Sequence, residues 1–309
     1  MLATLRDFLD DSFVTSTLNL IVSKYLILSN EDLEVWNDDP ESFVQEEDSD
    51  HWEFNIRQCA EKLVTVLVSQ NRHLLAPILI EVLRQTPEAI DLTSILQREA
   101  VYCAIGLAAY DVYEYMSFSE WVEAKLVTES QSTSIELSIL RRRISWLIGK
   151  WISVKSPQFS RPILYQILIH LMRQNEASLV VRITAVSDLK LAIDDYEFVA
   201  EDFRPFVGAA IHLFVILMAD CDSVETKMKI LECLIAITER MESHIIPFVD
   251  PIIFILPKLW DRSDGDNIFR ALIVATMTKL VISTGAQSKK LHDIVTPVIR
   301  QSLDTSQVK

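Results

Sequence analysis

Glycine is scarce in this chain, with five residues among 309, about 1.6% against roughly 7% in average proteins. Each glycine stands alone, so neither GxGxxG nor GxxxxGK[ST] occurs. Nucleotide sites of these two kinds are therefore excluded, because their glycines let the backbone approach the phosphates. A chain with few glycines also has few tight turns, which argues against β-sandwiches and barrels.

Cysteine is also sparse, and the four residues at 59, 103, 221 and 233 form no CxxC pair. This usage is typical of reduced thiols in an intracellular protein. The first residues, MLATLRDFLDD, lack the basic and apolar regions of a signal peptide. The longest conspicuous uncharged run, 205–219, is shorter than the ~20 apolar residues of a membrane helix. The sequence therefore predicts no membrane association.

Apolar residues recur at helical spacing nearly everywhere, as in ASLVVRITAVSDLKLAI at 177–193. Short breaks containing Pro, Asp or Ser separate these stretches. Two breaks, Asp222–Glu225 and Ser117–Glu120, show an N-cap residue followed three positions later by Glu. We expect an all-α fold with short connections.

An internal repeat organises the helices. Basic residues at 57, 98, 142, 182, 229 and 270 open apolar helices at separations of 41, 44, 40, 47 and 41 residues. HEAT and armadillo arrays have periods of about 40–47 residues. The sequence therefore predicts one right-handed α-solenoid segment over 1–309, of six to seven HEAT-like helical hairpins. An irregular helical globule is the alternative.

Most of these basic residues follow an acidic or amide residue by six or seven positions. An acid in the turn can cap the next helix, and an Arg one or two turns later can pair within or between repeats. We expect this structural ladder to hold the repeats together. Its members are Asp50, Arg57, Asp91, Arg98, Arg142, Asn175, Arg182, Asp222, Lys229, Asp264 and Arg270. The triplet Arg141–Arg143 also indicates pairing between layers rather than an anion site.

Negative charge is concentrated near the start of the chain. Residues 1–50 carry 13 acidic and 2 basic side chains, and 30–50 carry ten acidic and no basic ones. We interpret 30–50 as an acidic insertion loop, held to the solenoid by Trp36 and Phe43. It is either a solvated surface segment or an arm for a basic partner. The candidate partner-binding residues are Trp36, Glu46, Glu47 and Asp48, and replacing Glu47 is expected to change stability little.

No pattern of catalytic or metal-binding residues is present. The six histidines are scattered, and neither HExxH nor GxSxG occurs. We therefore expect neither an enzyme nor a cofactor. Direct nucleic-acid binding is also unexpected, because it needs clustered Lys and Arg and the formal charge here is −15.

Several stretches resemble the importin-β (karyopherin-β) family of nuclear transport receptors. They are DLEVWNDDPESFVQEED (32–48), REAVYCAIGLAAYDVYEY (98–115), LRRRISWLIGKWISVK (140–155), VVRITAVSDLKLAIDDYEF (180–198) and ETKMKILECLIAITERM (225–241). The resemblance runs over almost the whole chain. It covers only the middle portion of such a receptor, which is around three times longer.

This resemblance implies a segment of an import receptor that binds cargo and nucleoporins for Ran-dependent transport through the nuclear pore. The implied partners are basic or folded protein cargo, phenylalanine–glycine nucleoporins and the Ran GTPase, the last through parts of the fold mostly absent here. The implied location is the cytoplasm and the nucleus, including the nuclear envelope. The alternative function is a helical-repeat scaffold subunit of an intracellular enzyme complex.

Overall fold

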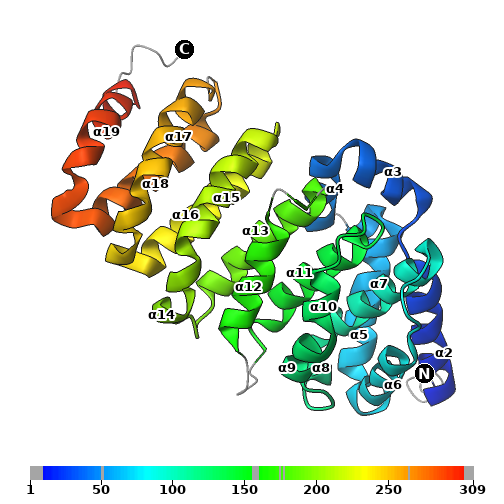
Figure 1. The fold of residues 1–309 in the computed structure, drawn as a ribbon. Coiled ribbons are helices and arrows are strands. Elements are labelled where there is room, and N and C mark those ends of the chain that lie inside the picture. Colours follow the sequence, from blue (N-terminus) through cyan, green and yellow to red (C-terminus); the bar gives the residue numbers. More distant parts are fainter. Residues whose placement is uncertain are drawn as a thin grey trace, which may run out of the picture. The chain divides into compact units, whose positions relative to one another are not determined.

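The computed structural model describes residues 10–49, 52–154, 160–173, 175–176, 178–263 and 265–302, and these contain helices and no strand. The all-α fold expected from the sequence is confirmed (Figure 1). The helices form two compact units. One comprises Met1–Ser160 and Asn175–Ala185, and the other comprises Arg161–Gln174 and Val186–Lys309.

The first unit contains helical hairpins coloured blue to green in Figure 1. Helices α7 (Leu92–Leu107) and α11 (Ser138–Trp151) pack along each other, and α6 (Arg72–Gln85) packs against α7. The helical segments are α2 (Asp11–Leu20), η1 (Ile21–Tyr25), α3 (Asn30–Asp38), α4 (Pro40–Asp48), η2 (Trp52–Phe54), α5 (Ile56–Gln70), α6 (Arg72–Gln85), α7 (Leu92–Leu107), α8 (Ala109–Val112), α9 (Phe118–Trp121), η3 (Val122–Leu126), α10 (Val127–Ser130) and α11 (Ser138–Trp151).

In the second unit, α16 (Val224–Met241) and α18 (Asn267–Thr284) lie side by side. Helices α15 (Val207–Asp220) and α17 (Val249–Asp261) pack against each other. Helix α13 (Leu179–Asp194) contributes residues to both units. The other segments of the second unit are α12 (Arg161–Leu171), α14 (Ala200–Phe203), η4 (Arg204–Phe206), α15 (Val207–Asp220), α16 (Val224–Met241), η5 (Glu242–Phe248), α17 (Val249–Asp261), α18 (Asn267–Thr284), η6 (Gly285–Ser288) and α19 (Lys289–Ser302).

Several helices begin at a residue whose side chain accepts a hydrogen bond from a backbone N–H of the first turn. Ser117 accepts a hydrogen bond from the backbone N–H of Glu120, as its spacing predicts. The cap of α16 is Ser223 rather than Asp222, since Ser223 accepts from the N–H of Thr226. The helix therefore begins one residue later than the sequence pattern suggested.

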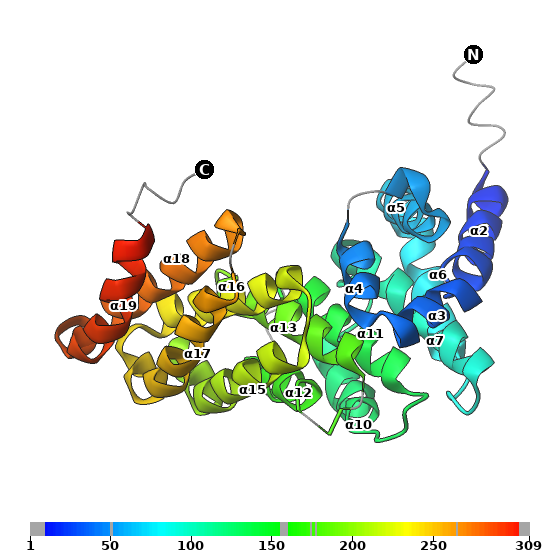
Figure 2. The ribbon, with the colours of Figure 1, turned by 90° about the horizontal axis from the view of Figure 1, so that it is seen from above.

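The acidic segment is not a loop. It folds into α3 and α4, two short helices labelled in Figure 2, and Glu47 of α4 pairs with Arg57 of α5. Ser29 and Asp39 cap these helices, and Pro40 occupies the first turn of α4. Acidic residues in both first turns interact favourably with the helix dipole. The high acid content of this segment suggested a loop, although the helix-start residues Ser29, Asp39 and Pro40 stand in the sequence.

Three helical stretches of the described residues are long and apolar enough, by length and composition alone, to cross a membrane: Ala200–Asp220, Val224–Asp261 and Asn267–Ser288. This differs from the sequence-based expectation, which counted only unbroken uncharged runs. Helices continue past single charges and, at 224–261, through η5. Each of these stretches also contributes fully or nearly fully buried side chains, such as Phe214, Ile230 and Ile273.

Candidate functional site

A buried cluster of arginine and glutamate side chains joins α5, α7 and α11. The Glu99 side chain is only 1% exposed, and its Oε1 accepts from Arg57 Nη2 at 3.0 Å and from Arg143 Nε at 2.7 Å. Arg143 is equally buried. Glu99 thus compensates two guanidinium groups in the core, where an unpaired charge would be very costly.

Helix α4 joins this cluster through Glu47. Its carboxylate accepts from Arg57 Nη1 and from Arg142 Nη2, both at 2.9 Å. Burial acts to raise the pKa of Glu47, but the charges of Arg57 and Arg142 outweigh it and lower the pKa to about 2. The expectation that Glu47 can be replaced with little effect treated it as an exposed loop residue, whereas its side chain anchors α4 to two other helices.

The aromatic residues of the acidic segment are buried as expected. Trp36 is 6% exposed, and its ring packs edge-on against Phe43 at a centroid distance of 5.0 Å. The Arg142 guanidinium lies 5.7 Å from the centre of the Phe43 ring. Trp36 is therefore a core side chain of the α3–α4 pair, with little surface to offer a partner, whereas Glu46 and Asp48 are exposed.

Asp91 and Arg98 do not pair with each other in the manner proposed for the ladder. Asp91 caps α7 by accepting from the Ser94 N–H at 2.8 Å. Arg98 is nearly fully buried, donates to Glu129 at 2.6 Å and also contacts the Pro87 carbonyl oxygen. The acid therefore starts the helix, and the arginine binds groups from other segments.

The remaining predicted ladder residues lie in varied surroundings. Asn175 is exposed, whereas its neighbour Glu176 is buried and accepts from Arg141 Nη2 at 2.9 Å. Arg182 is buried, and Lys229 is half-buried. Arg270 donates to the Ser263 hydroxyl and lies 4.9 Å from the Trp260 ring centre. The exposed Asp222 accepts from Lys227 through its backbone oxygen, while Asp50 and Asp264 fall outside the described residues.

The arginine triplet was identified from the sequence as a set of pairing groups, and its members do pair: Arg141 with Glu176, Arg142 with Glu47, and Arg143 with Glu99. The glutamate partners were missed. Glu99 carried one signal, because it is an acid directly before the apolar run AVYCAIGL at 100–107. Nothing in the sequence indicates which arginine it binds.

A polar cavity of about 500 Å³ opens beside this cluster. Side chains of α4, α5, α7 and α11 line it, together with Trp52 of η2. Two of the predicted partner-binding residues, Glu47 and Asp48, are among them. The full lining is Glu47, Asp48, Ser49, Trp52, Gln58, Glu61, Lys62, Thr65, Gly106, Leu107, Tyr110, Trp146 and Lys150.

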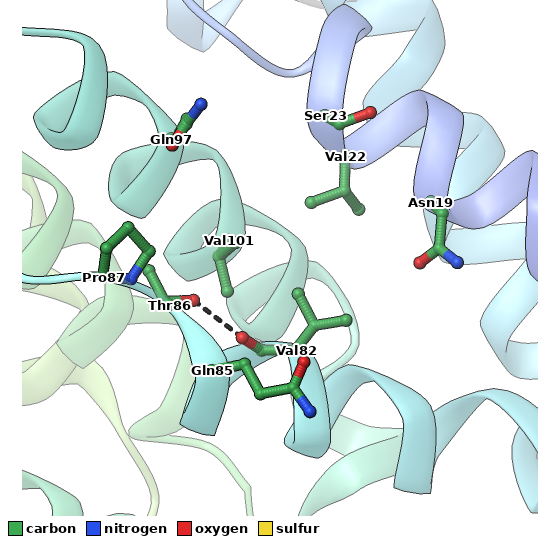
Figure 3. A pocket seen from close by; sticks show the side chains of 9 residues that line it. All are labelled: Asn19, Val22, Ser23, Val82, Gln85, Thr86, Pro87, Gln97 and Val101. Carbon is green, nitrogen blue, oxygen red and sulfur yellow. Dashed lines mark hydrogen bonds between the residues drawn. The ribbon is translucent and has the colours of Figure 1, made fainter.

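A second, more apolar cavity of about 340 Å³ lies between η1, α6 and α7 (Figure 3). Val22, Val82 and Val101 supply its apolar surface, and Asn19, Gln85 and Gln97 add amide groups. The Thr86 hydroxyl is occupied by a hydrogen bond to the Val82 carbonyl oxygen. Apolar and amide side chains therefore share the lining of this cavity.

Among the described residues, no group of three or more His, Cys, Asp or Glu side chains is arranged to hold a metal ion. All four cysteines are free thiols, and Cys103 and Cys233 are fully buried. Burial raises the pKa of both thiols. Neither is therefore an activated nucleophile.

The fold is that of an all-α helical-repeat protein. No protein-family model matches the sequence. Human importin-11 is 37% identical over 298 residues, which cover 95% of this chain and 30% of that protein. The importin beta-like protein KAP120 of Saccharomyces cerevisiae is 27% identical, over 98% of this chain and 30% of its own length.

A solved structure supports the same relationship. Lph2, a bidirectional nuclear transport receptor of S. cerevisiae, superimposes with a TM-score of 0.90 at 28% identity, covering 97% of this chain and 31% of its own. The homologues of this chain are thus importin-β family proteins, and the resemblance inferred from the sequence is confirmed. The solenoid class is confirmed with it. The relatives are transport proteins and not enzymes, in agreement with the expectation.

The chain spans about 30% of the length of the curated relatives that it matches. The prediction that 1–309 forms one continuous solenoid segment stays a prediction, as does partner binding by Trp36, Glu46, Glu47 and Asp48.

Proposed function

We propose that this chain is the partner-binding segment of a nuclear transport receptor, which shuttles between cytoplasm and nucleus and associates with the nuclear pore. The observation that carries this proposal is the 37% identity to importin-11 across 95% of the chain. The helical-repeat scaffold remains the alternative, but no particular observation favours it.

The two cavities provide different surfaces for the two proposed classes of partner. The acidic side chains of α4 suit basic cargo, because opposite charge speeds encounter and selects Lys- and Arg-rich surfaces. The cavity of Figure 3 suits phenylalanine–glycine nucleoporin repeats, since valines and amides can contact an apolar ring and its peptide groups. Ran binding is proposed for the whole receptor rather than for this chain.

A pulldown from purified components tests the nucleoporin contact. The immobilised chain is incubated with a phenylalanine–glycine repeat peptide, and bound peptide is measured. Val82→Glu, in the apolar cavity, is expected to reduce retention at least several-fold. Val66→Glu is the matched control, because Val66 is 49% exposed on α5 outside this cavity.

The same format tests the cargo contact with a folded basic nuclear protein. Replacing both Glu46 and Asp48 by Lys is expected to reduce retention, whereas replacing the exposed Glu120 and Glu123 by Lys is expected to leave it unchanged. If the unmodified chain retains neither the repeat peptide nor the basic protein, the transport role of this segment is refuted.

A further inference from the structure

The segment that joins α10 to α11 in the first unit, residues 131–137, presents an exposed hydroxyl group. Exposure alternates along this segment. The side chains at positions 131, 133 and 135 are exposed, whereas those of Ser132 and Ser134 are half-buried. Alternation with a period of two is the geometry of an extended backbone, in which successive side chains point in opposite directions. The side chain of Thr133 therefore points into solvent.

Arg141 of α11 holds this segment in place. Its Nη1 donates to the Ser134 carbonyl oxygen at 2.6 Å, while its Nη2 donates to Glu176 at 2.9 Å. The backbone N–H of Ser134 also donates to the Ser132 hydroxyl at 3.4 Å. The residues on either side of Thr133 are thus hydrogen-bonded to their surroundings, whereas the Thr133 hydroxyl has no hydrogen-bond partner among the described residues.

The charge near Thr133 in the sequence is negative. Residues 126–140 contain two glutamates and no basic residue, and one of the two, Glu136, follows Thr133 by three positions. The Ser134 hydroxyl donates to the Glu136 carboxylate, and this hydrogen bond lowers the pKa of the exposed group, which is therefore ionised at neutral pH. Protein kinases select substrates by the pattern of charge around the hydroxyl, so this segment suits a kinase with a basic substrate-binding surface.

The same spacing, Ser or Thr followed three positions later by Asp or Glu, occurs at three other places among the described residues. At Ser29 and Ser117 it marks the start of a helix, where the hydroxyl accepts from the backbone N–H of the third following residue. Ser263 is buried, and its hydroxyl donates to the Trp260 carbonyl oxygen. Of the four hydroxyl groups, that of Thr133 is the one that is both exposed and without a hydrogen bond.

We propose that Thr133 is a phosphorylation site for a protein kinase that selects acidic substrates. In this reaction the Thr133 hydroxyl oxygen forms a bond to the γ-phosphorus of ATP. The bond from that phosphorus to the β–γ bridging oxygen breaks, ADP leaves with the bonding electrons, and the hydroxyl proton passes to the catalytic carboxylate of the kinase. The phosphoryl group adds a charge of about −1.5 to −2 at pH 7 to a segment that is already acidic. The inference does not depend on the proposed transport role.

A kinase assay on the folded chain tests the proposal. The chain is incubated with ATP, Mg²⁺ and casein kinase 2, which selects acidic substrates, and tandem mass spectrometry of the digested product locates the phosphoryl groups. We expect phosphate at Thr133 and little at Ser29, Ser117 or Ser263. Synthetic peptides that carry the four motifs should all be phosphorylated, because no fold occupies their hydroxyl groups. A kinase that selects basic substrates, such as the cyclic-AMP-dependent kinase, should leave Thr133 unmodified.

Variants separate recognition of the acid from exposure of the hydroxyl. Glu136→Gln removes the recognised charge and is expected to lower the rate of Thr133 phosphorylation at least several-fold. Glu120→Gln is the matched control, because it changes an exposed glutamate at the same spacing after Ser117 and should leave that rate unchanged. Thr133→Ser is expected to remain a substrate, whereas Thr133→Val is expected to lose the phosphate from this segment.

The absence of phosphate at Thr133 in the folded chain would overturn the inference, as would an equal rate in Glu136→Gln. Phosphorylation of the three serines at the same rate as Thr133 would also overturn it, because the fold would then select no site. Circular dichroism of each variant confirms that the helices are intact, since Glu120, Thr133 and Glu136 are all exposed.

Discussion

Replacing Glu99 by Gln is expected to destabilise the first unit severely. The glutamine keeps almost the same volume and one acceptor oxygen, but it removes the charge that Arg57 and Arg143 share. Both arginines remain in the core, where their side chains are 6% and 1% exposed. Glu47 compensates Arg57 in part, whereas Arg143 has no comparable second carboxylate among the ion pairs of the described residues.

The expected loss of stability is the free-energy cost of leaving a buried charge without its ion-pair partner. Removing one partner of a buried ion pair typically costs about 3–5 kcal/mol. For a unit of 150–250 residues, each kcal/mol lowers the melting temperature by about 2–4 °C, so the expected decrease is about 6–20 °C. By contrast, Glu123→Gln changes an exposed side chain of the same type and should alter stability by less than about 0.5 kcal/mol.

Urea denaturation followed by circular dichroism measures both variants, with differential scanning fluorimetry for the melting temperature. The double variant Glu99→Leu with Arg143→Met separates charge from packing. Apolar replacement of a whole buried pair is often neutral, so this variant should recover much of the loss. If Glu99→Gln matches the Glu123→Gln control, the buried cluster does not hold these helices together, and the reasoning is refuted.

Three further predictions concern other parts of the first unit. Glu47 has a folded-state pKa of about 2 against an ordinary value of 4.5, so its contribution of about 3 kcal/mol is present above pH 4.5 and lost as the pH falls toward 2. The difference in unfolding free energy between the unmodified chain and Glu47→Gln should therefore shrink over that range, and a constant difference would contradict this assignment. Gly106→Ala should lower the free energy of unfolding by about 1–3 kcal/mol, because the added methyl group displaces the Trp146 ring. In a Trp146→Leu background this loss should largely vanish, and denaturation of the unmodified chain, the two single variants and the double variant measures it. Asp91→Ala should lower the free energy of unfolding by about 1 kcal/mol, because α7 loses its cap. A double-mutant cycle with Arg98→Met should give a coupling energy near zero. Strong coupling would instead support the direct pairing proposed from the sequence.

The sequence alone was sufficient for the all-α, helical-repeat class of the fold, though not for every helix. Helical periodicity, cap residues and the spacing of the basic residues are local or regular signals, and each helix needs only its own residues to display them. Trp36 and Phe43 were correctly expected to be buried, since two isolated aromatic side chains in a polar segment gain much from leaving water. The same segment was misread as a loop because its composition outweighed the caps at Ser29 and Asp39.

Only the tertiary structure decided which charges pair. Glu47 and Arg142 are 95 positions apart, and Glu99 lies 42 positions from Arg57 and 44 from Arg143. The regular spacing of acid and arginine suggested local partners, but Asp91 is taken up by the start of α7 and does not pair with Arg98. A long arginine side chain can reach several neighbouring helices, so its partner depends on how the helices pack, which no stretch of sequence records.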